Sequence, residues 1–446
     1  MQKPAQSFKL ILLVAAIFLT SCSNEKNYKT PLQPNSEVYY SDPVDYINSI
    51  RLDSRLNQLK PNQILSHSAQ NHAKYTFINK VQSHDEQEGM PAFSGKTPTD
   101  RAQNVGYFSG ASENISINSK SQIESVSGLM SAIYHRFAFL DPSIDEIGYG
   151  TFGDKDRVNL TYNMGNSQIN EFCKRGVSDS GYGKFYTGAC KQKEISISEN
   201  RFNNYKDLNF NEYTYYPNSE NTKAFFSSEI PDPIPECKIT ANPISIEFSS
   251  YKKAVSMVSF KVFDGEDELK DTKILTSEND VNSIFNKFQF ALFSKEVFKF
   301  NHSYRAEFEY IQDSKTKKVA WDFKTSTPKY QYFIAKNGDV LGLEPDIWYD
   351  VFFYPDNCND VFKKYSMSYR FMSKPAIDTI DTNSIRVKLS GVKNAYVTLE
   401  TDNGKKIKMF LLNSSESLSI FDYKGYIFGF FVVIFAIFYT IIKRRR

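Results

Sequence analysis

Histidine, cysteine and tryptophan are scarce in this chain of 446 residues, which contains five, five and two of them. No two cysteines have C-x-x-C spacing, which argues against a zinc ribbon or a thioredoxin-type redox site. The chain also lacks the G-x-S-x-G elbow of many serine hydrolases and a glycine-rich phosphate loop that ends in Lys-Ser/Thr. The formal net charge of +3 is nearly balanced, so the composition gives no electrostatic basis for binding nucleic acid.

Apolar residues make up 41% of the chain and aromatic residues 15%, most of them Phe and Tyr. A chain of this length can bury two or three cores, because domains usually contain about 100 to 200 residues. Aromatic side chains are favoured in sheets that pack face to face. The composition predicts a β-rich protein, and the two ends of the chain indicate that it is exported.

Residues 1–22 have the pattern of a bacterial lipoprotein signal peptide. Lys3 and Lys9 precede an apolar run over 10–19, which is too short to span a bilayer but suits a signal-peptide core. The sequence Leu-Thr-Ser-Cys that follows looks like a lipobox, in which Cys22 is acylated and becomes the first residue of the mature chain. A core cysteine after an ordinary signal is the alternative. A polar spacer over 23–36 follows.

At the other end, residues 425–442 carry no charge and are followed by a basic tail over 443–446. A helix of this length, at about 1.5 Å per residue, covers most of a roughly 30 Å hydrocarbon core. This pattern predicts a C-terminal transmembrane helix with a cytoplasmic tail. The bulk of the chain would then lie on the periplasmic or extracellular side of a bacterial cell envelope. Which membrane holds it, and whether the tail is removed, stay open.

The four cysteines after Cys22 are an even number in an exported chain, which predicts two disulfides. We pair Cys173 with Cys190, because that loop is local and rich in Gly and Ser. Cys237 and Cys358 would then tie the two later domains together. Three connectivities are possible on paper, and the second bond has the weaker basis.

Residues 37–166 are expected to form a mixed domain of helices and strands. Apolar residues at helical spacing predict one helix before Pro61, a second after it and a third over 123–139. Two strands, "IGYGTF" and "VNLTYNMG", close the domain. The next stretch, 167–235, mixes turn residues with aromatics and has no regular period. We expect it to be a linker, extended where Pro231, Pro233 and Pro235 alternate.

Two segments of alternating apolar and polar residues follow, over 236–327 and 328–414. Their spacing between turn signals predicts two all-β, immunoglobulin-like sandwich modules. Trp321 is expected in the core of the first module. Asn403-Gly404 is expected to supply the positive φ values of the last hairpin turn.

Four of the five histidines, His67, His72, His84 and His135, lie within one stretch of the chain. His84, Glu113 and His135 are each expected at a turn or a helix end, where cleft residues are usually presented. Two imidazoles and a carboxylate can hold zinc or another divalent metal, can share protons, or can form a satisfied hydrogen-bond network under a loop. His72 lies on an apolar helix face and is expected to pack, and His67 is expected at the surface.

An ordered set of motifs runs from about 46 to 164: "INSIRLDSRL", "ILSHSAQNHAKY", "SHDEQEG", "FSGKTPTDRAQNVGY", "SENIS" and "LMSAIYHRFAFLDPSIDEIGYG". This set resembles the bacterial branch of the CAP superfamily of cysteine-rich secretory, antigen and pathogenesis-related proteins. The resemblance implies an α-β-α sandwich whose cleft is lined by two histidines and acidic residues. His84, Glu113 and His135 match the cleft positions.

The chain departs from the family pattern before the second histidine. Leu129, Ala132, Ile133 and Tyr134 stand where bacterial relatives often have Trp, Ser, Pro and a Gly-like residue. Many eukaryotic members have a second glutamate in the preceding helix, where this chain has only Glu124, in a different context. Glu86 or Glu88 could supply a second acid from the loop.

The sequence thus predicts an α+β protein: a CAP domain, two β-sandwich modules and a C-terminal transmembrane helix, anchored to the membrane through a lipid and that helix. Its predicted function is non-catalytic binding or adhesion, with a His/Glu cleft for a small apolar ligand or an envelope glycan and a possible divalent metal. The alternative is a metal-dependent hydrolase of peptides or envelope polymers, which needs an open metal position and a base. A structural protein with a vestigial cleft is a third reading.

Overall fold

The computed structural model of the protein describes residues 27–35, 40–155, 157–208, 211–218, 222–249, 255–369, 373–416 and 424–443. The chain divides into two compact units, which are described separately. Unit 1 comprises Met1–Gln33, Tyr330–Tyr354 and Phe362–Arg446, and unit 2 comprises Pro34–Lys329 and Pro355–Val361. The predicted signal peptide, the lipobox with Cys22, and the arginines of the basic tail lie outside the described residues.

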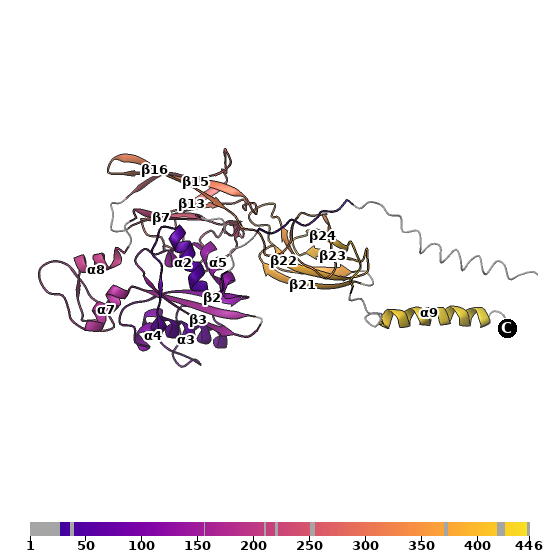
Figure 1. Ribbon diagram of the computed structural model, residues 1–446, viewed down its shortest axis with the longest axis horizontal. Coiled ribbons are helices and arrows are strands. Elements are labelled where there is room, and N and C mark those ends of the chain that lie inside the picture. Colours follow the sequence, from indigo (N-terminus) through magenta and orange to yellow (C-terminus); the bar gives the residue numbers. More distant parts are fainter. Residues whose placement is uncertain are drawn as a thin grey trace, which may run out of the picture. The chain divides into compact units, whose positions relative to one another are not determined.

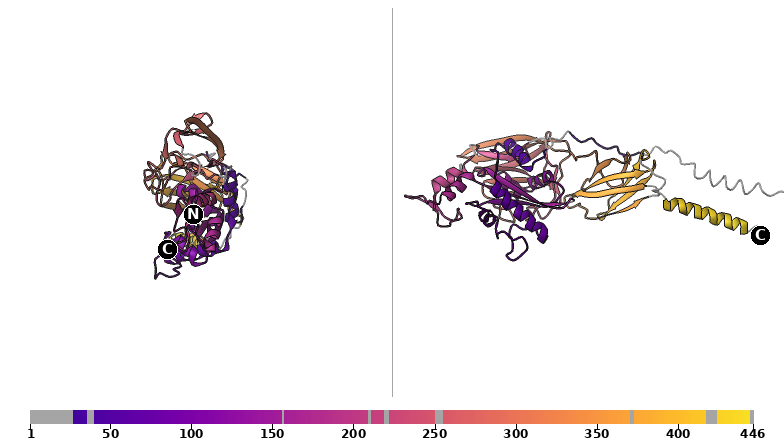
Figure 2. Two further views of the ribbon diagram at one scale, coloured as in Figure 1. Left: turned by 90° about the vertical axis from the view of Figure 1, so that its left-hand side faces the viewer. Right: turned by 60° about the horizontal axis from the view of Figure 1, so that its bottom comes forward.

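Unit 2 begins with a four-stranded sheet of strand order β1-β3-β4-β2, in which β1 and β3 are parallel and the other pairs antiparallel. The strands are β1 (Lys60–Pro61), β2 (Ser112–Ser119), β3 (Glu146–Gly153) and β4 (Val158–Gly165). The helices are α2 (Pro43–Asp53), α3 (Gln63–Asn79), α4 (Pro98–Asn104), α5 (Gln122–Ser131) and α6 (Ile133–Phe139). Helices lie on both faces of the sheet, with α2 and α5 on one side and α3 and α4 on the other (Figures 1 and 2).

The core of this domain joins helices and sheet. Ile47 and Ile50 of α2 pack with Val126 of α5 and with Leu160 and Tyr162 of β4, all buried. On the opposite face, α3 lies so close to β3 that a Cβ atom added to Gly148 or Gly150 would lie 2.1 Å from a backbone nitrogen of the helix. The glycines of "IGYG" therefore permit the contact between α3 and the sheet.

The single helix expected over 123–139 is wrong, because Ala132 has extended backbone angles (φ −86°, ψ 118°) and separates α5 from α6. The break starts a new helix immediately before His135. The N-cap residue of α6, Ala132, makes no side-chain hydrogen bond to the helix. The first N–H groups of α6 therefore need acceptors from elsewhere in the fold.

The stretch 167–235 differs from the irregular linker that we expected. It contains α7 (Ser167–Arg175), β5 (Phe185–Tyr186), β6 (Ile197–Ser198), α8 (Glu199–Lys206), β7 (Tyr213–Tyr216) and β8 (Phe225–Phe226). A small core around Ile169, Phe172 and Ile195 includes the disulfide between Cys173 and Cys190, the pairing expected from the sequence.

The first β module consists of two four-stranded sheets of order β13-β14-β10-β7 and β12-β11-β15-β16. Their strands, besides β7, are β10 (Ile244–Phe248), β11 (Ser256–Asp264), β12 (Asp267–Glu268), β13 (Thr272–Leu275), β14 (Gln289–Ser294), β15 (Ser303–Gln312) and β16 (Lys315–Lys324). Aromatic rings join the two sheets: Phe248 and Phe290 lie 5.8 and 5.1 Å from Phe308, measured between ring centroids. Trp321 is buried, as expected. Thus β7, from the expected linker, belongs to this module.

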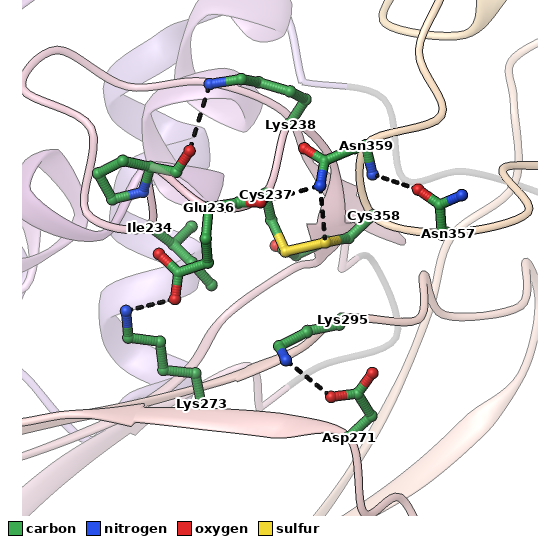
Figure 3. Close-up of a disulfide and its surroundings, with 12 residues drawn as sticks. Ile234, Glu236, Cys237, Lys238, Asp271, Lys273, Lys295, Asn357, Cys358 and Asn359 are labelled. Atoms are coloured by element: carbon green, nitrogen blue, oxygen red, sulfur yellow. Dashed lines mark hydrogen bonds and ion pairs between the residues drawn. A yellow bond between two sulfur atoms is a disulfide. The ribbon is translucent and has the colours of Figure 1, made fainter.

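A second disulfide joins Cys237 to Cys358, again the pairing expected from the sequence. The short strand β9 (Thr240–Ala241) follows Cys237. The segment 355–361 belongs to unit 2, although the residues on both sides of it belong to unit 1. Beside the bond, the side chain of Asn359 donates to the carbonyl oxygen of Glu236 (Figure 3). The backbone N–H groups of Lys238 and Ile239 donate to the carbonyl oxygen of Cys358.

Unit 1 contains two further four-stranded sheets, of order β17-β19-β22-β21 and β18-β24-β23-β20. Their strands are β17 (Tyr332–Ala335), β18 (Val340–Leu343), β19 (Trp348–Phe353), β20 (Tyr365–Tyr369), β21 (Ser373–Asp381), β22 (Ser384–Gly391), β23 (Tyr396–Thr401) and β24 (Lys406–Leu411). Both sheets contribute to one core, and Gly404 has the positive φ expected at the last turn. The immunoglobulin-like assignment of both modules stays a prediction.

Backbone hydrogen bonds hold the part of the expected polar spacer that the structure describes, residues 27–35. Within unit 1, the backbone of Lys29 bonds to Val340 and Gly342, and that of Leu32 bonds to Tyr332. At the other end, α9 (Lys424–Lys443) occupies the segment expected to cross the membrane. Among the residues that the structure describes, no helix is both long and apolar enough to span a membrane, so the predicted transmembrane helix at 425–442 is not confirmed.

Candidate functional site

His84 and Glu113 form the first half of the site. His84 lies in the loop between α3 and α4, and Glu113 is the second residue of β2. The Nδ1 atom of His84 lies 3.0 Å from Oε1 of Glu113. The imidazole is half exposed, at 47%, whereas the carboxylate is fully buried. The loop therefore holds an accessible ring against an inaccessible acid.

The charge of Glu113 is compensated from inside the domain. Arg101, on α4, donates from Nη2 to both carboxylate oxygens at 2.8 and 2.7 Å, and Asn163 donates to Oε2 at 3.0 Å. Burial alone would raise the pKa of Glu113. The hydrogen bond from His84 and the charges of His72 and Arg101 outweigh burial and hold this pKa below its usual range. Glu113 is therefore ionised, and both of its oxygens are engaged.

His72 lies behind this pair and is completely buried, as its place on the helix led us to expect. It is hydrogen-bonded as well as packed. Its Nδ1 lies 2.9 Å from Oε1 of Glu86, and its Nε2 lies 2.9 Å from the carbonyl oxygen of Ser83 and 3.6 Å from Glu113. Both ring nitrogens of His72 therefore face acceptors. Arg101 lies within ion-pair distance of both buried carboxylates, 2.7 Å from Glu113 and 3.7 Å from Glu86.

His135 and Glu229 form the second half of the site. Nδ1 of His135, in the first turn of α6, lies 2.6 Å from Oε1 of Glu229. The same oxygen accepts the backbone N–H groups of Tyr134 at 2.9 Å and His135 at 3.1 Å. Glu229 thus caps the helix that starts at the Ala132 break. Its other oxygen, Oε2, is buried and has no hydrogen-bond partner among the described residues.

Glu229 is the site residue that the sequence did not reveal. It lies 94 residues after His135, in the expected linker, and no motif surrounds it. From the sequence we considered Glu86, Glu88 and Glu124 for the second acid of the site, but the acid hydrogen-bonded to His135 is Glu229. Glu88 and Glu124 are exposed, and Glu86 is buried against His72 and Ser94. His67 is exposed, as expected.

The two halves face each other. The rings of His84 and His135 have centroids 6.5 Å apart and planes inclined by 32°. Asn114, the neighbour of Glu113 on β2, donates to the carbonyl oxygen of His135 at 2.8 Å. Each imidazole thus has its Nδ1 held by a buried carboxylate, which favours the tautomer with its lone pair on Nε2.

The arrangement does not provide the metal-ligand set expected from the sequence, in which Glu113 binds the ion with His84 and His135. Glu113 is engaged by Arg101 and Asn163, so it orients His84 rather than offering an oxygen to an ion. Among the described residues, no group of three His, Cys, Asp or Glu side chains is arranged to hold a metal ion.

The position of Glu229 depends on a shared core between the CAP-like domain and the first β module. Ala132, Ile133 and Phe137 pack with Phe226 and Phe285 in one buried cluster. Polar contacts reinforce this junction.

Tyr134 donates to Asp280 at 2.5 Å, and the buried guanidinium of Arg136 donates to Asn242 and to the carbonyl oxygen of Pro243. Burial lowers the pKa of Arg136 to about 10, which still leaves it charged at neutral pH. The start of α6 therefore lies at a buried, hydrogen-bonded junction between two modules.

Two cavities lie elsewhere in the domain, and neither is lined by His84 or His135. One, of about 660 Å³, lies beside α2, β1 and the start of α3, and the other, of about 330 Å³, lies near the start of α5. We assign the chemistry to the histidine pair, because it combines buried charge with an accessible ring.

Residues 44–164 match the model of the cysteine-rich secretory protein family (CAP), so this segment is a CAP domain. The resemblance seen in the motifs is therefore confirmed for this domain. No curated protein matches the chain significantly.

Solved structures similar to the chain include an extracellular protein of Bacillus anthracis that contains an SCP domain, with 25% identity and a TM-score of 0.24 over 27% of this chain and 38% of that one. Another is an outer surface protein of Borrelia burgdorferi, at 18% identity and a TM-score of 0.24 over 27% and 87%. A third is a venom allergen-like protein of Schistosoma mansoni, at 13% identity and a TM-score of 0.21 over 27% and 84%. The matched region thus spans well under half of the Bacillus protein.

Proposed function

We propose that the protein is an exported, non-catalytic binding module of a bacterial cell envelope, whose cleft captures a small glycan-like ligand between His84 and His135. The observation that supports this is the pair of imidazoles, each held through Nδ1 by a buried carboxylate. Rings fixed in this way present Nε2 lone pairs that can accept hydrogen bonds from sugar hydroxyl groups. A purely apolar ligand would leave these lone pairs without partners.

Export and lipid anchoring are part of this proposal. Two disulfides suit an oxidising compartment, and the lipobox sequence would place a lipid on Cys22. Cys22→Ser should abolish incorporation of labelled palmitate into the chain, while Cys237→Ser should not affect it. Equal labelling of both variants would contradict the lipid anchor.

The second candidate is a metal-dependent hydrolase. Carboxylate–histidine pairs often orient metal ligands, which favours a divalent ion such as zinc between the two Nε2 atoms. A catalytic zinc usually has three protein ligands and an open position. The described residues offer two imidazoles and no third ligand there, so we rank this function second.

Calorimetry on the full chain in detergent separates the two functions. Truncation after residue 330 would remove Cys358 and leave Cys237 unpaired, so the full chain is required. The titrants are a soluble peptidoglycan disaccharide and zinc, at about pH 7.5 and about pH 5.5, on either side of the ordinary histidine pKa. The wild type is compared with the His84→Ala, His135→Ala double variant and with His67→Ala, which alters an exposed histidine outside the cleft.

Disaccharide binding without zinc that is lost only in the double variant would support the binding module. Zinc binding that is lost in the double variant and weaker at the lower pH, together with zinc-dependent cleavage, would favour the hydrolase instead. If wild type and double variant respond alike to both titrants, the cleft proposal is wrong.

A further inference from the structure

Between Cys173 and Cys190 the chain forms a protruding loop that the cleft does not use. We call residues 176–189 the tyrosine loop. It extends away from the rest of unit 2 between α7 and α8 (Figure 1). The ring of Tyr182 is fully exposed, at 108% of the reference area, and Val177 and Tyr186 are 67% and 41% exposed.

The base of the tyrosine loop is firmly held. The disulfide closes it, and β5 pairs with β6. Asp179 accepts hydrogen bonds from the backbone and hydroxyl of Ser198 and from Arg201, each at 2.9 Å. The ring of Tyr186 lies 4.7 Å from that of Phe202. A loop with so many fixed points presents its tip with little loss of entropy on binding.

The tip itself holds Tyr182 outward. Gly181 and Gly183 flank it with φ values of 122° and 127°, which side chains rarely adopt. A Cβ atom added to either glycine would meet nothing within 4 Å, so crowding does not explain these glycines. They instead allow the backbone turn that places the tyrosine ring in solvent.

Basic residues lie in the tyrosine loop and next to the disulfide at its base. Residues 171–201 contain six Lys and Arg against four Asp and Glu, a net charge of +2. Asp179 is neutralised locally by Arg201. Exposed basic side chains in or beside the loop are Lys174, Arg175, Lys184, Lys191 and Lys193. A convex aromatic tip with this charge complements a flat anionic surface.

We propose that the tyrosine loop docks on the interface of a phospholipid bilayer that contains anionic lipids. Tyrosine rings favour the headgroup region, since one end is apolar and the other polar. Lysine and arginine side chains near the surface are attracted to anionic headgroups. This contact is independent of the cleft and of either terminus, and it would orient unit 2 against a membrane.

The test introduces a fluorescent reporter at the tip of the full chain. The Tyr182→Trp variant is incorporated into vesicles of phosphatidylcholine, with or without phosphatidylglycerol. The emission of the new tryptophan and its quenching by brominated lipid are measured. We expect a blue-shifted, quenched indole in the anionic vesicles only. Val258→Trp, on β11 of the same unit and 50% exposed, is the matched control and should not be quenched. The spectrum of the wild type gives the background from its two native tryptophans.

A second variant tests the charge. Adding Lys184→Gln to Tyr182→Trp should lower partitioning onto the anionic surface about fivefold, since a basic residue at such a surface contributes about that factor. The proposal fails if the indole at 182 gives the same emission and quenching with and without the anionic lipid. It also fails if the reporter at 258 is quenched equally.

Discussion

His84 and His135 are each held by a buried glutamate, but the glutamates are satisfied in different ways. Glu113, which holds His84, is paired with Arg101 through two short hydrogen bonds. All of these residues belong to the CAP domain. This half of the site therefore carries its own charge compensation.

Glu229, which holds His135, accepts neutral backbone donors at the start of α6. The nearby cation, Arg136, donates instead to residues of the first β module. The comparison teaches that one half of the site is stabilised by ion pairs within a domain. The other half exists only because the following module is docked there.

The largest expected effect is on the ion-paired half. Arg101→Met removes the cation beside the buried carboxylates of Glu113 and Glu86 and should cost about 3–5 kcal/mol of unfolding free energy. The hydrogen-bond acceptors of Arg136 are neutral, and Glu229 attracts it through its charge without a hydrogen bond, so Arg136→Met should cost less, about 1–3 kcal/mol. Urea unfolding followed by fluorescence measures both. An equal cost would remove the distinction between the two halves.

Glu229→Gln tests the junction half. The amide oxygen can still accept the backbone N–H groups at α6, so the expected loss is about 1–2 kcal/mol, the difference between charged and neutral acceptors. Disaccharide binding should weaken at the same time, because His135 loses its orienting charge. Unchanged binding would show that Glu229 only caps the helix.

The stability of the Glu113 half should depend on pH. The pKa of Glu113 is held below its ordinary value of 4.5, so its contribution to stability is complete above that value and is lost as the pH falls through the folded pKa. Between about pH 6 and pH 3 the unfolding free energy of the wild type should therefore fall more than that of Glu113→Gln. Parallel curves for Glu113→Gln and wild type would contradict this.

The smallest effect is expected at the direct link between the halves. Asn114→Ala removes the bond from β2 to the carbonyl oxygen of His135 and should cost about 1 kcal/mol. If His84 and His135 bind one ligand, the variant should also weaken its binding. A stability loss as large as that of Arg101→Met would mean that the halves are not separately stabilised.

The sequence predicted much of the CAP domain, because its signals are local. Helical spacing before and after Pro61, the two closing strands and the motif order all survive in the structure. The cysteine pairing could be predicted because only four cysteines remain after Cys22.

What could not be predicted depends on tertiary contacts. Nothing around Glu229 marks it, since its role comes from docking against α6, and the break at Ala132 needs the module that packs on it. Strand β7 could not be predicted either, because its stretch of sequence has no regular alternation of apolar residues. Its strand conformation depends on pairing with β10.

The bond between Cys237 and Cys358 has a mechanical consequence. It closes a covalent ring across a sequence separation of 121 residues, which a pull on the two ends of the chain cannot extend. Without it, unravelling that stretch would release about 400 Å of contour. Tension on the backbone at Cys237 and Cys358 would instead pass through the sulfurs, so the enclosed stretch, which holds most of the first β module, would not be extended.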